Sequence, residues 1–347
     1  MDNAKNYKIP IIYVNQVGAQ TELIFDGGSL FVDQDGKVVR EMAYFSPDFA
    51  IIDTADQTSN HKIQPETTTI ATIHDALVLG ISDYFRKTGF KSATLGLSGG
   101  IDSAVTLVLA ERALGAANIQ VLLMPSKYSS DHSVDDAVKL AENLGVRYDI
   151  VKIHEIVDAF DSTLANVFKG MVPDLTEENI QARVRGTLLM GLSNKFGHIL
   201  LNTSNKSESA VGYGTLYGDM NGGLSVLGDV YKTDVFEMAR YINRDEEIIP
   251  LNTIQKPPSA ELRPDQKDSD SLPDYEILDK ILFDYIELAK SPAEIIAMGF
   301  DEATVHRTVL MVNRNEYKRF QTPPILRVSS KAFGFGRKMP LVAKYAL

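Results

Sequence analysis

The chain has 347 residues, 44% of them hydrophobic, with a formal net charge of −11 and a sequence pI near 5.1. This size and apolar content predict a globular protein with a substantial core, and the negative charge disfavours a nucleic-acid partner. The absence of cysteine excludes disulfides, a thiolate nucleophile and a cysteine-bound zinc. The sequence has neither an apolar run of roughly 18 to 20 residues nor a signal-peptide pattern, so we expect a cytoplasmic protein without a membrane partner.

The first 53 residues predict a small β-rich segment. Short apolar runs between residues 9 and 53 are separated by DGG and DQDG, which are hairpin-turn signals. About five short strands cannot bury both faces of a sheet by themselves, so we expect this segment to pack against another part of the chain. Residues 54–65 are polar with little periodicity, and we interpret them as a linker.

From residue 66 onward, predicted helices and strands alternate. The predicted helices cover residues 66–89, 101–115, 133–145, 176–197 and 232–244, and the predicted strands cover 92–97, 119–125, 147–153 and 198–203. Such alternation is typical of a parallel sheet covered on both faces, so the sequence predicts a doubly wound α/β domain. Residues 257–273 are polar and proline-rich, and we expect them to form a mobile lid.

The turn S-G-G-I-D-S at residues 98–103 leaves a predicted strand and opens a predicted helix. Backbone N–H groups at such a turn, together with the positive end of the helix, favour an anion, and phosphate is the usual one. Glycine allows a close backbone approach, the serine hydroxyls can donate hydrogen bonds, and the carboxylate can hold Mg²⁺. The lysine of a Walker A loop and the spacing of a Rossmann fingerprint are both absent. A tight turn in which Ser and Asp act only as caps is the alternative.

The stretch GLSGGIDSA resembles the pyrophosphate-binding (PP-loop) turn of the ATP pyrophosphatase superfamily, whose members adenylate a substrate with ATP. The segments LLMPSKYSSDHSVDDAVKLAENLG, NIQARVRG through LGDVYKTDV, KPPSAELRPDQKDSDSLPDYEILD and NEYKRFQTPP follow in the order typical of NAD synthetases. The resemblance covers residues 66–330 and leaves 331–347 as a C-terminal tail. It implies amidation of deamido-NAD to NAD through an acyl-adenylate, with ATP, Mg²⁺ and ammonia required and AMP and pyrophosphate released. We also expect a homo-oligomer, at least a dimer.

The resemblance also implies roles for individual residues. It implies ATP contacts at Gly96, Leu97, Ser98, Gly99, Gly100, Ile101, Asp102, Ser103, Met124, Thr203, Lys232 and Ser259. It implies deamido-NAD contacts at Arg183, Glu208, Tyr317 and Lys318, and Mg²⁺ ligation by Asp102 and Glu208. Asp102 and Lys232 are the implied catalytic residues, the lysine by neutralising charge on the phosphates. Arg185, two residues beyond Arg183, is left out of the predicted site, with a surface helix charge as the alternative to a site role.

One stretch departs from the short ammonia-dependent enzymes of this family. Leu216 follows Thr215 in GYGTLYGDMNGG, where those enzymes carry a lysine, and this pattern indicates the glutamine-dependent class. Tyr217 and Asp219 are further candidates for contacts to the nicotinate group. Two alternatives stay open: another adenylating amidotransferase similar to GMP synthetase, and a non-catalytic nucleotide-binding subunit.

Residues 1–60 resemble the final strands of the nitrilase-like (carbon–nitrogen hydrolase) glutaminase domain of glutamine-dependent NAD synthetases. The resemblance rests on YVNQVG, ELIFDGGS and DQDG. Nitrilase-type chemistry needs a cysteine nucleophile, and this chain has none. We therefore expect an amidase remnant with an uncovered apolar face, a glutaminase domain or subunit outside this chain, and free ammonia as the direct nitrogen donor.

Overall fold

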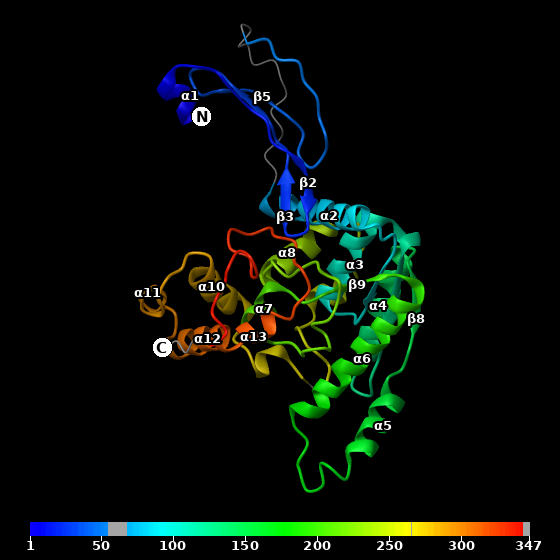
Figure 1. The fold of residues 1–347 in the computed structure, drawn as a ribbon. Helices are drawn as coiled ribbons and strands as arrows, with labels where there is room; N and C mark the ends of the chain where they lie inside the picture. The colour runs from blue at the N-terminus through cyan, green and yellow to red at the C-terminus, as the bar shows by residue number, and fades with distance from the viewer. Residues whose placement is uncertain (55–67, 265, 343–347) are drawn as a thin grey trace.

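The computed structural model describes residues 1–54, 68–264 and 266–342. Figure 1 shows an α/β body and an N-terminal β arm that rises from it beside helix α2 (Thr69–Thr88). The linker predicted for residues 54–65 lies, apart from residue 54, outside the described residues. No described helix combines the length and the apolar character that crossing a bilayer requires.

A five-stranded parallel sheet lies at the centre of the body, in the strand order β10-β9-β6-β7-β8. Its strands are β6 (Ala93–Gly96), β7 (Ile119–Leu123), β8 (Arg147–Ile150), β9 (Ile199–Asn202) and β10 (Leu224–Ser225). The chain starts in the middle at β6, moves outward through β7 to β8, and returns to the other side of β6 with β9. This reversal confirms the doubly wound prediction, and it opens a crevice beyond the carboxyl ends of β6 and β9, where open α/β sheets bind ligands.

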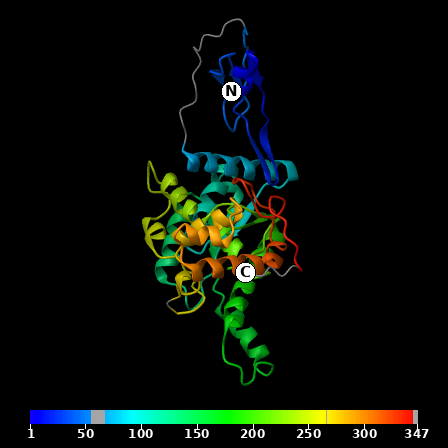
Figure 2. The ribbon, with the colours of Figure 1, turned by 90° about the vertical axis from the view of Figure 1, so that its left-hand side faces the viewer.

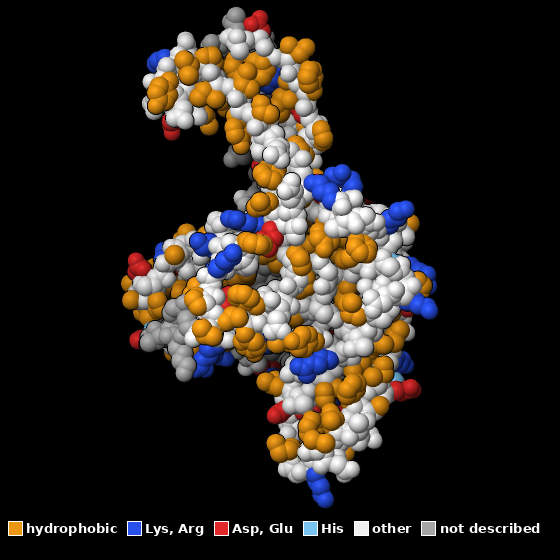
Figure 3. All heavy atoms as spheres, in the orientation of Figure 1, with side chains coloured by type: hydrophobic (Ala, Val, Ile, Leu, Met, Phe, Trp, Pro, Cys, Tyr) orange, Lys and Arg blue, Asp and Glu red, His pale blue; other side chains and the backbone are white. Residues whose placement is uncertain are grey.

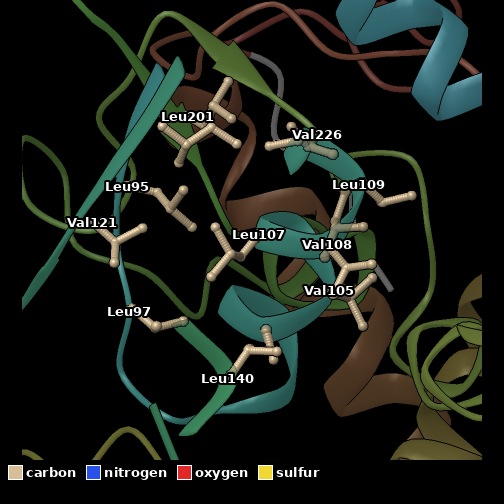
Figure 4. Packing of buried hydrophobic residues seen from close by; sticks show 14 of the residues in the cluster. Leu95, Leu97, Val105, Leu107, Val108, Leu109, Val121, Leu140, Leu201 and Val226 are labelled. Atoms are coloured by element: carbon tan, nitrogen blue, oxygen red, sulfur yellow. The ribbon is translucent and has the colours of Figure 1, made fainter. Parts of the chain in front are cut away.

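Helices cover both faces of this sheet. One face carries α2, α3 (Ile101–Leu114), α4 (Asp131–Asn143) and α8 (Lys232–Ile242), and the other carries α5 (His154–Leu164) and α6 (Leu175–Phe196). Leu95, Val121 and Leu201 point into the first cluster (Figure 4), whereas Leu122 and Leu200 belong to the second. Because neighbouring residues of a strand point to opposite faces, strands covered on both faces are apolar at nearly every position.

The remaining helices of the body lie in the second half of the chain, except η1, which lies between α3 and β7. They are η1 (Ala116–Asn118), α7 (Lys206–Val211), α9 (Leu251–Gln255), η2 (Asp268–Asp270), α10 (Tyr275–Ile286), α11 (Pro292–Ala297), α12 (Glu302–Arg314) and α13 (Glu316–Arg319). The Lys206 ammonium is fully buried between the carboxylates of Asp229 and Glu287 and donates to Ser329 Oγ and the Lys331 carbonyl. Lys331, the first residue of the C-terminal tail, is therefore hydrogen-bonded to the body.

The N-terminal arm contains α1 (Asp2–Tyr7), β1 (Ile11–Tyr13), β2 (Val17–Gln20), β3 (Leu23–Asp26), β4 (Leu30–Val32) and β5 (Val38–Glu41). The β2–β3 hairpin rests on α2, where the Asp83 carboxylate accepts the Ala19 N–H at 2.8 Å and pairs with Arg86 and Lys87. The antiparallel sheet β1-β4-β5 projects beyond it, with Ile12 of β1 50% exposed and Val14, just after β1, 78% exposed. The segment packs against the body and presents uncovered apolar side chains, as predicted.

A second projection lies opposite the arm and consists of α5, the start of α6 and the residues that join them (Figures 1 and 2). Helix α5 is absent from the sequence-based prediction. Apolar side chains gather on this projection, as Figure 3 shows, and Val167, Met171, Val172 and Leu175 are each at least two-thirds exposed. The sequence-based prediction did not anticipate this exposed apolar surface.

Candidate functional site

The S-G-G-I-D-S turn lies where β6 ends and α3 begins. Gly99 has a φ of +78°, and a Cβ built on it would lie 2.2 Å from the Ser133 carbonyl oxygen in the first turn of α4. Ser98 Oγ accepts the Gly100 N–H at 3.2 Å, and Ser103 Oγ donates to the Gly100 carbonyl at 2.9 Å. The two serines therefore stabilise the turn through hydrogen bonds within it. The N-cap of α3, Gly100, has no capping side chain, so this helix end is also available to an anion.

Two joined cavities of about 240 and about 200 Å³ lie beyond this turn, and we call them together the hollow. They share Ser98, Ser133, Thr203, Asp219, Ala260 and Glu261 as lining residues. The first half is largely apolar, with Leu97, Leu122, Met124 and Leu189 among its lining side chains. The second half is lined by charged groups that include Asp102, Glu208, Lys232, Lys256 and Asp268. A ligand that joins a flat apolar ring to a charged chain has the shape and polarity to fill both halves.

Three of the predicted residues meet at the charged half of the hollow. Lys232 Nζ lies 2.5 Å from Asp102 Oδ2 and 3.7 Å from Glu208 Oε1. The lysine side chain is only 3% exposed, while the carboxylates are 18% and 17% exposed. Asn205 links the two carboxylates, because its amide donates to Asp102 Oδ1 at 2.9 Å while its N–H donates to Glu208 Oε2. The two residues that the resemblance implies as Mg²⁺ ligands therefore lie close together.

The charges of this cluster perturb one another. Burial and, second, the neighbouring Asp102 charge together raise the pKa of Glu208 to about 8, against the opposing effect of Lys232. Burial alone would lower the pKa of Lys232, but the charges of Asp102 and Glu208 outweigh burial and raise it. Two carboxylates therefore share one ammonium, so Glu208 holds its proton more tightly, and a bound cation would favour its charged form.

The donor set of the cluster fits magnesium. Among the described residues, no group of three or more His, Cys, Asp or Glu side chains is placed to hold a metal ion. Mg²⁺ is commonly held in proteins by one or two carboxylates, with the remaining ligands supplied by water and substrate phosphates. Asp102 and Glu208 face the same hollow and offer such a pair of carboxylates.

Asp268 is a charged residue of the site that the sequence analysis missed. Its carboxylate accepts hydrogen bonds from Tyr213 Oη at 3.2 Å and from Tyr275 Oη at 3.0 Å, and it is 5% exposed. It lies in residues 257–273, which we expected to be a mobile lid with little to bury. That expectation is wrong for the second half of the segment, because Leu272 packs in an apolar cluster with residues of α10. Residues 257–262 border the hollow.

The other predicted ATP contacts divide into two groups. Gly96, Leu97, Ser98, Gly100, Ile101, Ser103, Met124, Thr203 and Ser259 line the hollow. Gly99 instead packs its backbone against α4. Arg185 also lines the hollow, where its Nε donates to the Met124 carbonyl at 3.1 Å and burial lowers its pKa to about 10. The alternative of a surface helix charge is therefore wrong, because this side chain bonds to the residue that follows β7 and lines the hollow.

The remaining deamido-NAD candidates lie outside the hollow. Arg183 is exposed, with its Nε 3.3 Å from the Leu216 carbonyl, and Tyr317 is 49% exposed. Lys318 Nζ donates to the carbonyls of residues 212 and 214 at 2.8 Å each. Tyr217 is 70% exposed, and its hydroxyl donates to the Gln321 side chain. Of the two further candidates, only Asp219 faces the hollow.

Comparisons with known proteins show the family to which the chain is similar. Residues 73–322 match the NAD synthase family. A glutamine-dependent NAD(+) synthetase from Acinetobacter baylyi is 51% identical, covering 98% of this chain and 64% of the relative. One from Synechocystis sp. is 47% identical, covering 99% and 62%. The chain thus spans less than two-thirds of the length of these relatives.

Solved structures give the same result. The glutamine-dependent NAD+ synthetase from Acinetobacter baumannii, in complex with ADP, is 45% identical and aligns with a TM-score of 0.72, covering 98% of this chain and 63% of that one. The NH3-dependent NAD synthetase from Campylobacter jejuni, in complex with nitrate, is 28% identical with a TM-score of 0.59, covering 75% and 100%. The family match decides against the alternative similar to GMP synthetase, and we conclude that the chain belongs to the NAD synthase family.

Proposed function

We propose that this chain catalyses the ATP-dependent amidation of deamido-NAD to NAD, with ammonia as the direct nitrogen donor. The nicotinate carboxylate attacks the α-phosphorus of ATP, and pyrophosphate leaves. Ammonia then attacks the acyl-adenylate, loses a proton, and displaces AMP to leave the amide. The observation that carries the proposal is the hollow, in which an anion-binding turn, one buried lysine and two carboxylates adjoin an apolar half.

The chain's residues fit the parts of ATP in this proposal. The adenine ring would lie in the apolar half against Met124, and the phosphates would lie at the turn that contains Ser98 and Ser103. The buried Lys232 ammonium would neutralise the charge that develops on the phosphates during adenylation. Asp102 and Glu208 would hold Mg²⁺, which supplies further neutralisation and alignment of the phosphates.

Deamido-NAD would contact Arg183, Glu208, Tyr317 and Lys318. The cationic side chains suit its pyrophosphate and carboxylate groups. Because Arg183 and Tyr317 are exposed outside the hollow, the dinucleotide would extend from Glu208 across the surface. We also propose that the protein is a homo-oligomer, at least a dimer, since the α5–α6 projection exposes a patch of apolar side chains. Light scattering after gel filtration tests the oligomer, and a monomeric mass would refute it.

The division of the chain into domains is part of the proposal. Residues 1–60 would be the closing strands of a nitrilase-like glutaminase domain, 66–330 the synthetase domain and 331–347 a tail. The relatives named glutamine-dependent, of which this chain spans 62% and 64%, support this division. A glutaminase domain or subunit outside the chain would then supply the ammonia.

The nitrogen donor gives the decisive test. The purified chain, supplied with ATP, Mg²⁺ and deamido-NAD, should form equal amounts of NAD and AMP with ammonium chloride and only background with glutamine. The ammonium rate should rise with pH as the fraction of nucleophilic NH₃ grows. A chain that binds nucleotide but releases no AMP would be a non-catalytic subunit. Glutamine-driven synthesis at a comparable rate, without a second protein, would overturn ammonia as the donor.

Two substitutions test the proposed carboxylates. Asp102→Asn and Glu208→Gln should each nearly abolish Mg²⁺-dependent AMP formation while leaving the fold intact, because each removes one negative charge that faces the metal. Glu237→Gln is the matched control, since Glu237 is an exposed carboxylate on α8, outside the residues that line the hollow. Equal rates for a site variant and this control would remove that carboxylate from the proposal.

A further inference from the structure

A buried carboxylate on α10 lies behind the charged cluster and takes no part in the reaction described above. Asp279 is 5% exposed and does not line the hollow. Its Oδ1 accepts the Ser207 hydroxyl at 2.5 Å. Its Oδ2 accepts both the N–H of Thr233 at 2.8 Å and the Thr233 hydroxyl at 2.9 Å. One side chain thus connects three helices that are distant in the sequence.

The partners of Asp279 are the sequence neighbours of the charged cluster. Ser207 directly precedes Glu208 on α7, and Thr233 directly follows Lys232 on α8. Ser207 Oγ also accepts the backbone N–H of Lys232 at 2.9 Å. Asp279 therefore accepts the backbone N–H of Thr233 directly and is linked to the backbone N–H of Lys232 through the Ser207 hydroxyl.

Helix α8 depends on this carboxylate for its N-terminal hydrogen bonds. Its N-cap residue, Tyr231, has no side-chain oxygen bonded to the first turn. The first N–H groups of a helix need acceptors from outside the helix, and a negative charge there is favourable. Asp279 supplies that acceptor from another helix, so the start of α8 is fixed relative to α10 and α7 at once.

We propose that Asp279 is a positioning residue that sets the placement of Lys232 relative to Glu208. The inference rests on the proposed function. A displacement of about 1 Å in a catalytic group is enough to lower a rate severely, because the reacting groups must meet at near-contact distances. Loss of the Asp279 hydrogen bonds would release the start of α8, which carries Lys232, from the start of α7, which carries Glu208. Partners behind the reacting groups commonly contribute tenfold to hundredfold to activity or metal affinity.

Asp284→Asn provides a matched control on the same helix. Asp284 is 6% exposed, as buried as Asp279, and pairs with Lys290 at 2.7 Å. It does not line the hollow, and its carboxylate accepts from Lys290 rather than from α7 or α8, so a purely structural loss should affect both variants alike.

The experiment compares kcat, the KM for ATP and the Mg²⁺ concentration for half-maximal rate, each per folded protein. Asp279→Asn should lower kcat roughly tenfold to hundredfold and raise the Mg²⁺ requirement, with the KM for ATP much less affected. Asp284→Asn should keep the wild-type kcat. If Asp279→Asn does not fold, Thr233→Val replaces it, and Thr233→Ser should recover the activity that Thr233→Val loses.

Equal kcat values for Asp279→Asn and Asp284→Asn, or for Thr233→Val and Thr233→Ser, would overturn the positioning role. The wild-type chain separates this failure from that of the proposed function. A folded wild-type chain that forms no NAD refutes the proposed function and the inference with it. If the wild-type chain is active and the variants of each pair have equal kcat values, only the inference is refuted.

Discussion

Replacement of Gly99 by alanine tests the close approach of the S-G-G-I-D-S turn to α4. The added Cβ would lie 2.2 Å from the Ser133 carbonyl oxygen, more than an ångström inside ordinary van der Waals contact. This oxygen belongs to helix backbone, and Ser133 Oγ is also bonded to Glu261 at 2.6 Å and to Lys256 at 3.0 Å. The clash therefore cannot be relieved by the rotation of one side chain, and it must displace the turn or the start of α4.

The magnitude has two contributions. A residue with a Cβ at a positive φ costs about 1–2 kcal/mol, offset by about 0.4–1 kcal/mol because alanine restricts the unfolded chain. Overpacking adds about 1–3 kcal/mol. Gly89→Ala is the matched control, because Gly89 has a φ of +84° and would meet no atom within 4 Å. We expect Gly89→Ala to cost about 1 kcal/mol and Gly99→Ala about 2–4 kcal/mol.

Urea denaturation followed by circular dichroism measures this difference, and calorimetric titration with ATP measures its effect on the hollow. Gly99→Ala should be the less stable variant and should also bind ATP more weakly, because the displaced turn lines both halves of the hollow. Gly89→Ala should bind ATP as the wild type does, since Gly89 lies at the end of α2. Equal stability of the two variants would refute the steric reasoning.

Three further predictions concern the stability of the fold. Burial raises the pKa of Asp83, but the bonds of this carboxylate to Ala19, Arg86 and Lys87 outweigh burial and hold the pKa below its ordinary value. The charged carboxylate should therefore stabilise the fold fully at neutral pH, and this stabilisation should disappear below about pH 4. Acid titration of unfolding should therefore be less steep for Asp83→Asn, and identical curves would contradict this. Lys206→Met should lower the free energy of unfolding, measured with urea, by about 3–5 kcal/mol, because it leaves buried carboxylates without their cation. A decrease below about 1 kcal/mol would contradict this prediction. Without nucleotide, backbone hydrogen exchange should already be slow at residues 266–272. Addition of ATP should slow the exchange only at residues 257–264. Uniformly fast exchange would contradict this prediction.

The local signals in the sequence determined the fold class and the centre of the site. The helix predicted over residues 101–115 forms over 101–114, and the turn before it lies at the carboxyl end of β6 as expected. Glycine, serine and aspartate at a strand–helix junction act through backbone geometry within a few residues, so their pattern is legible without the rest of the chain. Strand β10 is only two residues long, too short for a periodic pattern, and was not predicted.

The tertiary structure decided which side chains complete the site. Lys232 and Asp102 are 130 positions apart, and Asp279 and Ser207 are 72 apart, yet each pair forms a direct hydrogen bond. The sequence around Asp268 is polar and proline-rich, and its burial depends on two tyrosines from other segments. A charged residue is buried only where distant partners satisfy it, and the positions of those partners are fixed by the packing of helices on the sheet.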